Sequence, residues 1–168
     1  MLQSENTSAK RIFFVEDFQI FGERYGIDYR FPQLKDAQSS GSPVLQGNVE
    51  EMTLSSGISL THSDVRVLQP YETTSRHSSP LYMLVVLEGC VTLTLNDINY
   101  PVRPGMAFSS RLSEDQVMSA RHDADSTLKT LSFGVYPHDA GREALLESLL
   151  LEWQSLNAPT LVWHVPEF

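Results

Sequence analysis

Short runs of Val, Leu, Ile, Tyr and Thr recur between residues 49 and 136, and Gly, Pro, Asn, Asp or Ser separates each run from the next. The runs are Val49–Leu54, Ile58–Leu68, Leu81–Leu87, Val91–Leu95, Ile98–Val102, Gln116–Ala120 and Leu128–Tyr136. Short strands between turn signals are typical of an all-β sandwich or barrel. The pattern therefore predicts a mainly β fold.

The clearest strand signal lies just after the middle of the chain. Apolar residues alternate with threonines from Val91 to Leu95, so one face of this strand should be buried and the other wetter. Asn96 and Asp97 follow directly, and both residue types tolerate the positive φ that a two-residue hairpin turn requires. The sequence therefore predicts a hairpin that joins this strand to Ile98–Val102.

The period changes after residue 137, where a helical spacing replaces the strand pattern. Between Asp139 and Gln154, charged residues alternate with an apolar stripe at helical spacing, which predicts an amphipathic helix of about four turns. The stripe consists of Leu145, Leu146, Leu149, Leu150 and Trp153. The last ten residues, PTLVWHVPEF, are apolar enough to form a strand or a second docking element. We expect residues 138–168 to act as a dimerisation element.

Residues 1–42 mix aromatic and charged side chains with no sustained period. We expect them to form an irregular segment that packs on the body of the protein, and the QSSGSP stretch from Gln38 to Pro43 to be a turn or short linker. Residues 43–137 then form the β body.

Composition excludes several classes of protein. The chain has 12 Lys and Arg residues against 21 Asp and Glu residues, a formal charge of −9, and no basic run that could follow a phosphate backbone. A single cysteine, Cys90, excludes an internal disulfide framework. The N-terminus lacks the apolar core of a signal peptide, and no apolar run approaches the ~20 residues that cross a bilayer. We expect a cytoplasmic protein that binds neither DNA nor membranes through this chain.

The stretch YMLVVLEGCVTLTLNDINYPVRPGMAF, from Tyr82 to Phe108, resembles the cupin-type sensor domain at the N-terminus of AraC-family transcription regulators. It carries strand, Glu-Gly turn, strand, Asn-Asp hairpin, strand and Pro-Gly turn in the order of that family, and Gly89 and Gly105 permit the bends. The preceding GISLTHSDVRVLQPYE is similar to the branch that contains siderophore-responsive regulators of iron uptake. The resemblance implies a double-stranded β-helix, a cupin-like barrel, followed by a C-terminal amphipathic helix.

The same resemblance implies a function. We expect the effector-sensing and dimerisation domain of an AraC-type regulator: a homodimer that binds a small molecule in its barrel, while DNA is contacted only through a helix-turn-helix region absent from this chain. Two alternatives remain, a small cupin enzyme of the isomerase or epimerase type and a stand-alone small-molecule-binding cupin.

Cupin enzymes usually hold a metal through a His-x-His pair, a Glu, and a second motif that contains a further His. Alignment on Gly89 puts Ser75, His77 and Tyr82 at the first three ligand positions, and the stretch FSSRLSEDQ after the Pro-Gly turn contains no His. A first-row metal needs about three protein ligands. We therefore expect no metal, no other cofactor and no enzymatic activity.

The candidate effector-binding residues are Arg66, His77 and Tyr82. Each also has a simpler interpretation, since Arg66 could lie on a solvated rim, His77 in a polar loop, and Tyr82 in the core with a backbone partner. His62 and Asp64 are two residues apart on one predicted strand and should share a face. The candidate dimer-interface residues are Leu146, Leu149, Leu150 and Trp153, although the tryptophan could equally anchor the core.

Overall fold

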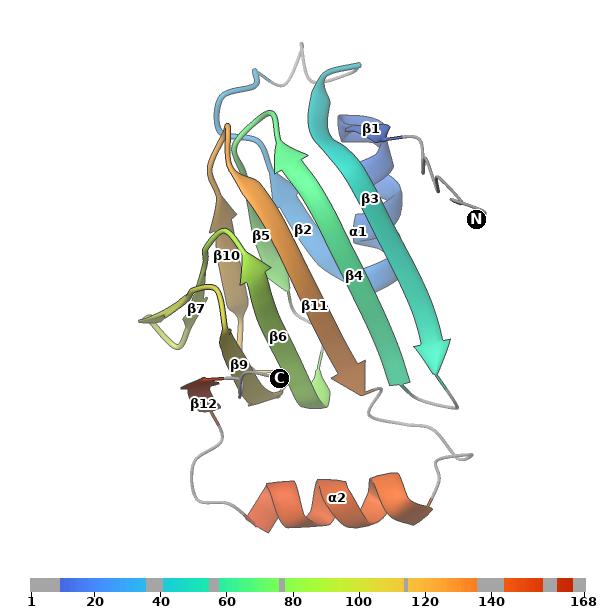
Figure 1. Ribbon diagram of the computed structural model, residues 1–168, viewed down its shortest axis with the longest axis vertical. Helices are drawn as coiled ribbons and strands as arrows, with labels where there is room; N and C mark the ends of the chain where they lie inside the picture. The colour runs from blue at the N-terminus through green and yellow to red at the C-terminus, as the bar shows by residue number, and fades with distance from the viewer. Residues whose placement is uncertain are drawn as a thin grey trace, which may run out of the picture.

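The protein is described here from a computed structural model, which defines residues 10–35, 41–54, 58–75, 78–113, 115–135, 144–155 and 160–164. These residues form two antiparallel β-sheets that face each other, with two helices (Figure 1). In spatial order, the larger sheet contains β1 (Arg11–Phe14), β3 (Pro43–Leu54), β4 (Ile58–Val67), β11 (Thr127–Val135), β6 (Ser79–Glu88), β9 (Met106–Leu112) and β12 (Thr160–His164). The smaller sheet contains β2 (Ile27–Arg30), β5 (Tyr71–Ser75), β10 (Met118–His122), β7 (Val91–Leu95) and β8 (Ile98–Val102). The mainly β, cupin-like fold expected from the sequence is confirmed.

The predicted hairpin is present with the predicted bounds. Leu95 pairs with Ile98, and the two turn residues between them, Asn96 and Asp97, have φ angles of 52° and 62°. Positive φ at both central positions matches the right-handed twist of the flanking strands. The local sequence is therefore sufficient to fix this corner of the smaller sheet.

Gly89 connects β6 to β7 and has a φ of +87°. A Cβ atom at this position would lie 2.4 Å from the backbone oxygen of Thr127, the first residue of β11. Only glycine fits, because both the backbone conformation and the close approach of the neighbouring strand exclude a side chain.

Within its described residues, 10–35 and 41–42, the N-terminal segment is not irregular, which corrects the expectation for this part of residues 1–42. Its described part contains β1, the helix α1 (Val15–Tyr25) and β2. The Asp17 carboxylate accepts a 2.8 Å hydrogen bond from the Phe14 backbone N–H at the start of α1, and Gly26 ends the helix with a φ of 65°. Val15 and Phe18 are buried on its inner face. Aromatic residues at helical spacing thus form a helix that packs into the β body.

The core lies between the two sheets. Val86 and Phe108 of the larger sheet are fully buried, and Leu93 and Leu95 of the smaller sheet are each 2% exposed. The N-terminal segment contributes Phe13 and Phe18 to the same cluster. The segment is therefore a structural part of the domain.

The described residues of the C-terminal part form α2 (Ala144–Ser155) and β12, as the helical spacing and the apolar last segment predict. Figure 1 shows α2 lying across one end of the sheets, and Trp153 attaches it there by a 3.0 Å hydrogen bond from its Nε1 to the Pro80 oxygen of β6. β12 pairs with β9, where Trp163 Nε1 donates to Ser109 Oγ at 3.0 Å. In the described residues, neither helix has the length and apolar character needed to cross a bilayer.

Candidate functional site

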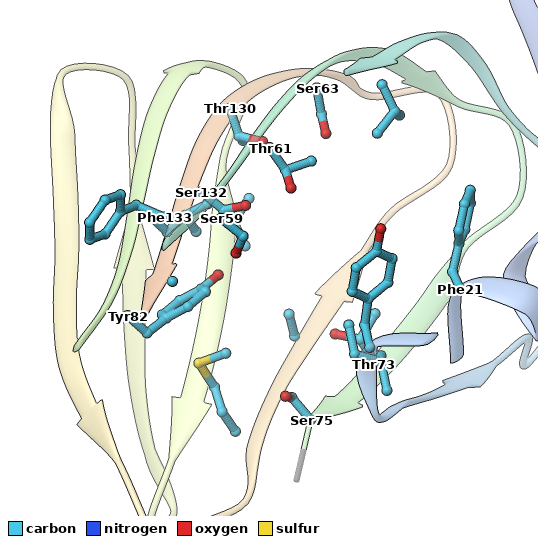
Figure 2. A pocket seen from close by; sticks show the side chains of 18 of the residues that line it. Phe21, Ser59, Thr61, Ser63, Thr73, Ser75, Tyr82, Thr130, Ser132 and Phe133 are labelled. Carbon is cyan, nitrogen blue, oxygen red and sulfur yellow. The ribbon is translucent and has the colours of Figure 1, made fainter. Parts of the chain in front are cut away.

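A cavity of about 440 Å³ lies between the two sheets and is closed on one side by α1. Its walls come from the inner faces of β3, β4, β11 and β6 in the larger sheet and of β2, β5, β7 and β10 in the smaller one. Figure 2 shows that side chains from both sheets and from α1 point into this space. The volume falls in the range of small-molecule sites.

Hydroxyl groups cover the centre of the larger sheet's inner wall. In β4, every second residue points inward, and these are Ser59, Thr61 and Ser63. In the neighbouring strand β11, the residue paired with Ser63 is Thr130 and the residue paired with Thr61 is Ser132. The two strands thus present a two-column lattice of hydroxyls toward the cavity (Figure 2).

The third row of this lattice has a gap. Gly134 of β11 pairs with Ser59 on one side and with Tyr82 of β6 on the other. A Cβ atom at Gly134 would lie 3.4 Å from Ser59 Oγ, and the Tyr82 hydroxyl points into the cavity (Figure 2). Burial raises the pKa of Tyr82 to about 12, so this hydroxyl stays protonated at neutral pH and can donate or accept a hydrogen bond.

Within the described residues, the lattice hydroxyls form no hydrogen bonds with protein atoms. By contrast, the hydroxyl of Ser79, at the edge of the same cavity, is bonded to the backbone oxygens of Leu81 and Val135, both at 2.8 Å. Polar groups that face a cavity without protein partners bind water or a ligand, because a hydroxyl without any partner is costly.

The opposite wall consists largely of aromatic rings, and Thr73 and Ser75 of β5 line the cavity beside them. Phe18 of α1 sits at the centre of a ring cluster, with centroids 5.7 Å from Phe21, 5.0 Å from Tyr29 and 5.4 Å from Tyr71. The first two of these contacts are edge-on, an arrangement that aromatic quadrupoles favour. The cluster fixes α1 and β2 against β5 and gives the cavity a rigid apolar side.

His122 of β10 also lines the cavity and stacks on Tyr71 with centroids 4.5 Å apart. Burial lowers the pKa of His122 to about 4, an effect only partly opposed by the nearby charge of Asp123. The imidazole is therefore neutral at physiological pH and can offer one donor and one acceptor.

Two charged residues reach the cavity, and they neutralise each other. Arg24 of α1 and Glu51 of β3 form an ion pair with a nitrogen-to-oxygen distance of 3.4 Å. Because the tyrosines and His122 are uncharged, the described lining carries no net charge at neutral pH.

Of the three predicted effector-binding residues, the structure places only Tyr82 in the cavity. Arg66 is exposed on the outer face of β4, 3.5 Å from Asp125, because the alternation of the strand directs it away from the cavity. It is not a cavity residue. His77 lies outside the described residues.

His62 and Asp64 do share one face of β4, as predicted, but it is the outer face. His62 Nδ1 lies 4.0 Å from a Glu50 carboxylate oxygen of β3. The opposite face of β4 lines the cavity, and the sequence marks that face by placing Ser59, Thr61 and Ser63 at alternate positions. The matching alternation in β11 completes the lattice only when the register of the two strands is known.

The structure changes the set of candidate dimer-interface residues. Leu150 is 3% exposed and belongs to the chain's own interior, so it does not face a partner. Trp153 is half-buried on β6, whereas Leu149 and Leu151 are 53% and 65% exposed. The side chain of Leu146 lies outside the described part of α2. In the described part of α2, the exposed leucines are therefore Leu149 and Leu151, which point to different sides of the helix because they lie two residues apart, with the buried Leu150 between them.

Among the residues that the structure describes, no group of three or more His, Cys, Asp or Glu side chains could hold a metal ion. Two of the three positions aligned with cupin ligands, Ser75 and Tyr82, line the cavity. The third, His77, is outside the described residues, so a metal-free cavity remains a prediction.

The chain matches a model of a known protein family. The family model described as the N-terminal domain of the regulatory protein PchR matches residues 46–161, which is more than half of the chain. No curated protein is similar enough in sequence to match.

The chain is similar in fold to the AraC-like transcriptional activator CuxR, with a TM-score of 0.51 at 10% identity over 76% of this chain and 47% of that one. It thus spans about half the length of that structure. A lower similarity is found to ToxT from Vibrio cholerae, with a TM-score of 0.46 at 12% identity over 66% of this chain and 43% of that one. The cupin domain of an XRE-family regulator from Enterobacter cloacae gives a TM-score of 0.44 at 12% identity over 56% of this chain and 99% of that one.

Proposed function

The chain belongs to the family of PchR N-terminal domains, which are parts of AraC-type transcription regulators, and on this premise we propose that it senses a small-molecule effector within its β body. One observation carries the proposal: a 440 Å³ cavity whose wall presents a lattice of hydroxyls without protein partners in the described residues. Such a wall has no structural purpose of its own, because an apolar wall would cost less to bury.

The proposal extends to the rest of the regulator. An acidic chain with a formal charge of −9 does not supply the phosphate contacts on which DNA binding depends, so DNA would be contacted by a region outside this chain. The protein would act in the cytoplasm as a homodimer with α2 as the contact, where exposed Leu149 on one side of the helix or exposed Leu151 on the other would meet the partner. Ligand binding would shift the equilibrium between two arrangements of the dimer by its difference in affinity for them.

The alternative of an isomerase or epimerase needs a histidine base and a tyrosine acid in the cavity. His122 and Tyr82 are both there, but a pKa of about 4 makes the first a weak base and a pKa of about 12 makes the second a weak acid. Binding is the chemistry that these two groups suit better.

A cavity-filling substitution tests the proposal in the full-length regulator. Thr61→Trp places a large side chain in the centre of the hydroxyl lattice, and His62→Trp, one residue away on the outer face of β4, is the matched control. In a reporter strain, we expect the control to respond to inducing growth conditions like the wild type and Thr61→Trp to stay at one level of transcription. An unchanged response of Thr61→Trp, with the protein present at normal abundance, would rule out the cavity as the sensing site.

A further inference from the structure

We infer that the cavity takes an electrically neutral molecule with several hydroxyl, ether or carbonyl groups along one side and a flat apolar face on the other. The inference rests on the proposed function, because it assigns a ligand chemistry to the same cavity. Three independent features of the lining lead to it: its charge balance, its hydroxyl lattice and its aromatic wall.

The first feature is the absence of a free charge on the described lining. Arg24 and Glu51 pair with each other at the edge of the cavity, and the side chain of Arg24 is 64% exposed. An anionic or cationic ligand buried here would lose its hydration without gaining a countercharge, unless it broke that ion pair. A neutral ligand meets neither cost.

The second feature is the kind and spacing of the polar groups. Serine and threonine hydroxyls both donate and accept, so they match hydroxyl, ether and carbonyl groups and have no preference for ions. Neighbouring strands lie about 4.8 Å apart, and alternate residues of one strand lie about 6.7 Å apart. The β4 column runs from Ser59 to Ser63, and the β11 column beside it runs from Gly134 to Thr130. Each column therefore spans about 13 Å along the sheet. A ligand that uses the lattice carries polar groups at intervals of about 5 to 7 Å.

The third feature is the wall opposite the lattice. Phe18, Phe21, Tyr29 and Tyr71 present rings held in edge and tilted contacts, so they offer a rigid surface to a ring or to the apolar face of a saturated ring. Thr73 and Ser75 of β5 line the cavity beside these rings, so a ligand between the two walls meets hydroxyls mainly on the side of β4 and β11 and apolar rings mainly on the side of α1.

A matched pair of probes separates charge from shape. Phenyl β-D-glucoside is neutral, carries hydroxyls and one aromatic ring, and differs from phenyl β-D-glucuronide chiefly by the carboxylate of the latter. Saturation-transfer NMR titrations with the wild-type chain should give a Kd for the glucoside at least tenfold lower than the Kd for the glucuronide. The Thr61→Trp variant should show no saturation-transfer signal from the glucoside. Stronger binding of the glucuronide would overturn the inference. Absence of cavity-dependent binding by the glucoside would also overturn it, while leaving the proposed function to the reporter experiment above.

Two further variants test how the neutral probe is held. Thr61→Val keeps the shape of the side chain but removes its hydroxyl, and it should weaken binding about 3- to 10-fold, whereas Thr92→Val, at an outward position of β7, should leave it unchanged. Raising NaCl from about 0.05 to 0.5 M should change the affinity less than twofold. A tenfold loss of affinity at the higher salt concentration would show that the ligand is held by charge and would refute the inference.

Discussion

Replacing Phe18 with alanine tests whether α1 is a structural part of the domain. The Phe18 ring is 4% exposed and contacts four other rings, with centroid distances from 5.0 Å to Tyr29 up to 5.8 Å to Phe31. Removing a buried phenylalanine side chain costs ~3–5 kcal/mol, of a total stability of ~5–15 kcal/mol for a typical domain. For a chain of this size, ~1 kcal/mol corresponds to ~2–4 °C, so the midpoint should fall by ~6–20 °C.

Differential scanning calorimetry of the wild type, Phe18→Ala and Phe14→Ala measures this effect. Phe14 belongs to the same segment but is 39% exposed, so its substitution should lower the midpoint by only a few degrees. If Phe18→Ala lowered the midpoint no more than Phe14→Ala, the reasoning that places α1 in the core would be refuted.

Three other outcomes follow from the structure. In urea titrations, Gly89→Ala should lower the free energy of unfolding by more than ~3 kcal/mol, because the added Cβ would lie 2.4 Å from a backbone oxygen of β11. Gly105 also has a positive φ but faces open space, so Gly105→Ala should lower it by only ~1–2 kcal/mol. The pKa of His122 is lowered to about 4 in the folded state, so the unfolded chain binds a proton first as the pH falls. Wild-type stability should therefore drop by up to ~3 kcal/mol between pH 6.5 and 4, and His122→Gln should lose less over that window; equal pH dependence of the two proteins would contradict this. Light scattering should find a dimer of the wild-type chain and a folded monomer of the Leu149→Glu and Leu151→Glu double variant, and a dimer of unchanged affinity would place the contact elsewhere.

The parts of the fold that could be predicted from the sequence are those specified by neighbouring residues. The hairpin from Val91 to Val102 has the predicted bounds, because strand alternation and the turn residues Asn96 and Asp97 lie next to each other in the chain. The helix α1 was missed. Its inner face combines Val15 with aromatic residues, and exposed Ile20 interrupts the pattern that would mark an amphipathic helix.

The candidate site could be predicted only at Tyr82. The family alignment indicates single positions such as Tyr82. Arg66 is a candidate only from its place in an alternating strand, and alternation alone does not tell which face of β4 lines the cavity. The hydroxyl lattice depends on the register between β4 and β11, in which Thr61 lies beside Ser132, 71 residues further along the chain. Such long-range pairings depend on tertiary packing and leave no local signal. The neutral charge of the cavity likewise appears only once Arg24 and Glu51 are seen to pair.

Because α1 both belongs to the core and closes the cavity, its local opening and ligand occupancy are linked. Amide protons of α1 exchange with solvent when the helix detaches transiently, and detachment removes Phe18, Phe21 and Arg24 from the cavity wall. A ligand that needs this wall binds only the closed form, and therefore slows exchange in α1 by a factor of 1 + [L]/Kd. The backbone amides of Val15–Tyr25 would thus act as a built-in reporter of occupancy, one that needs neither DNA nor a known effector.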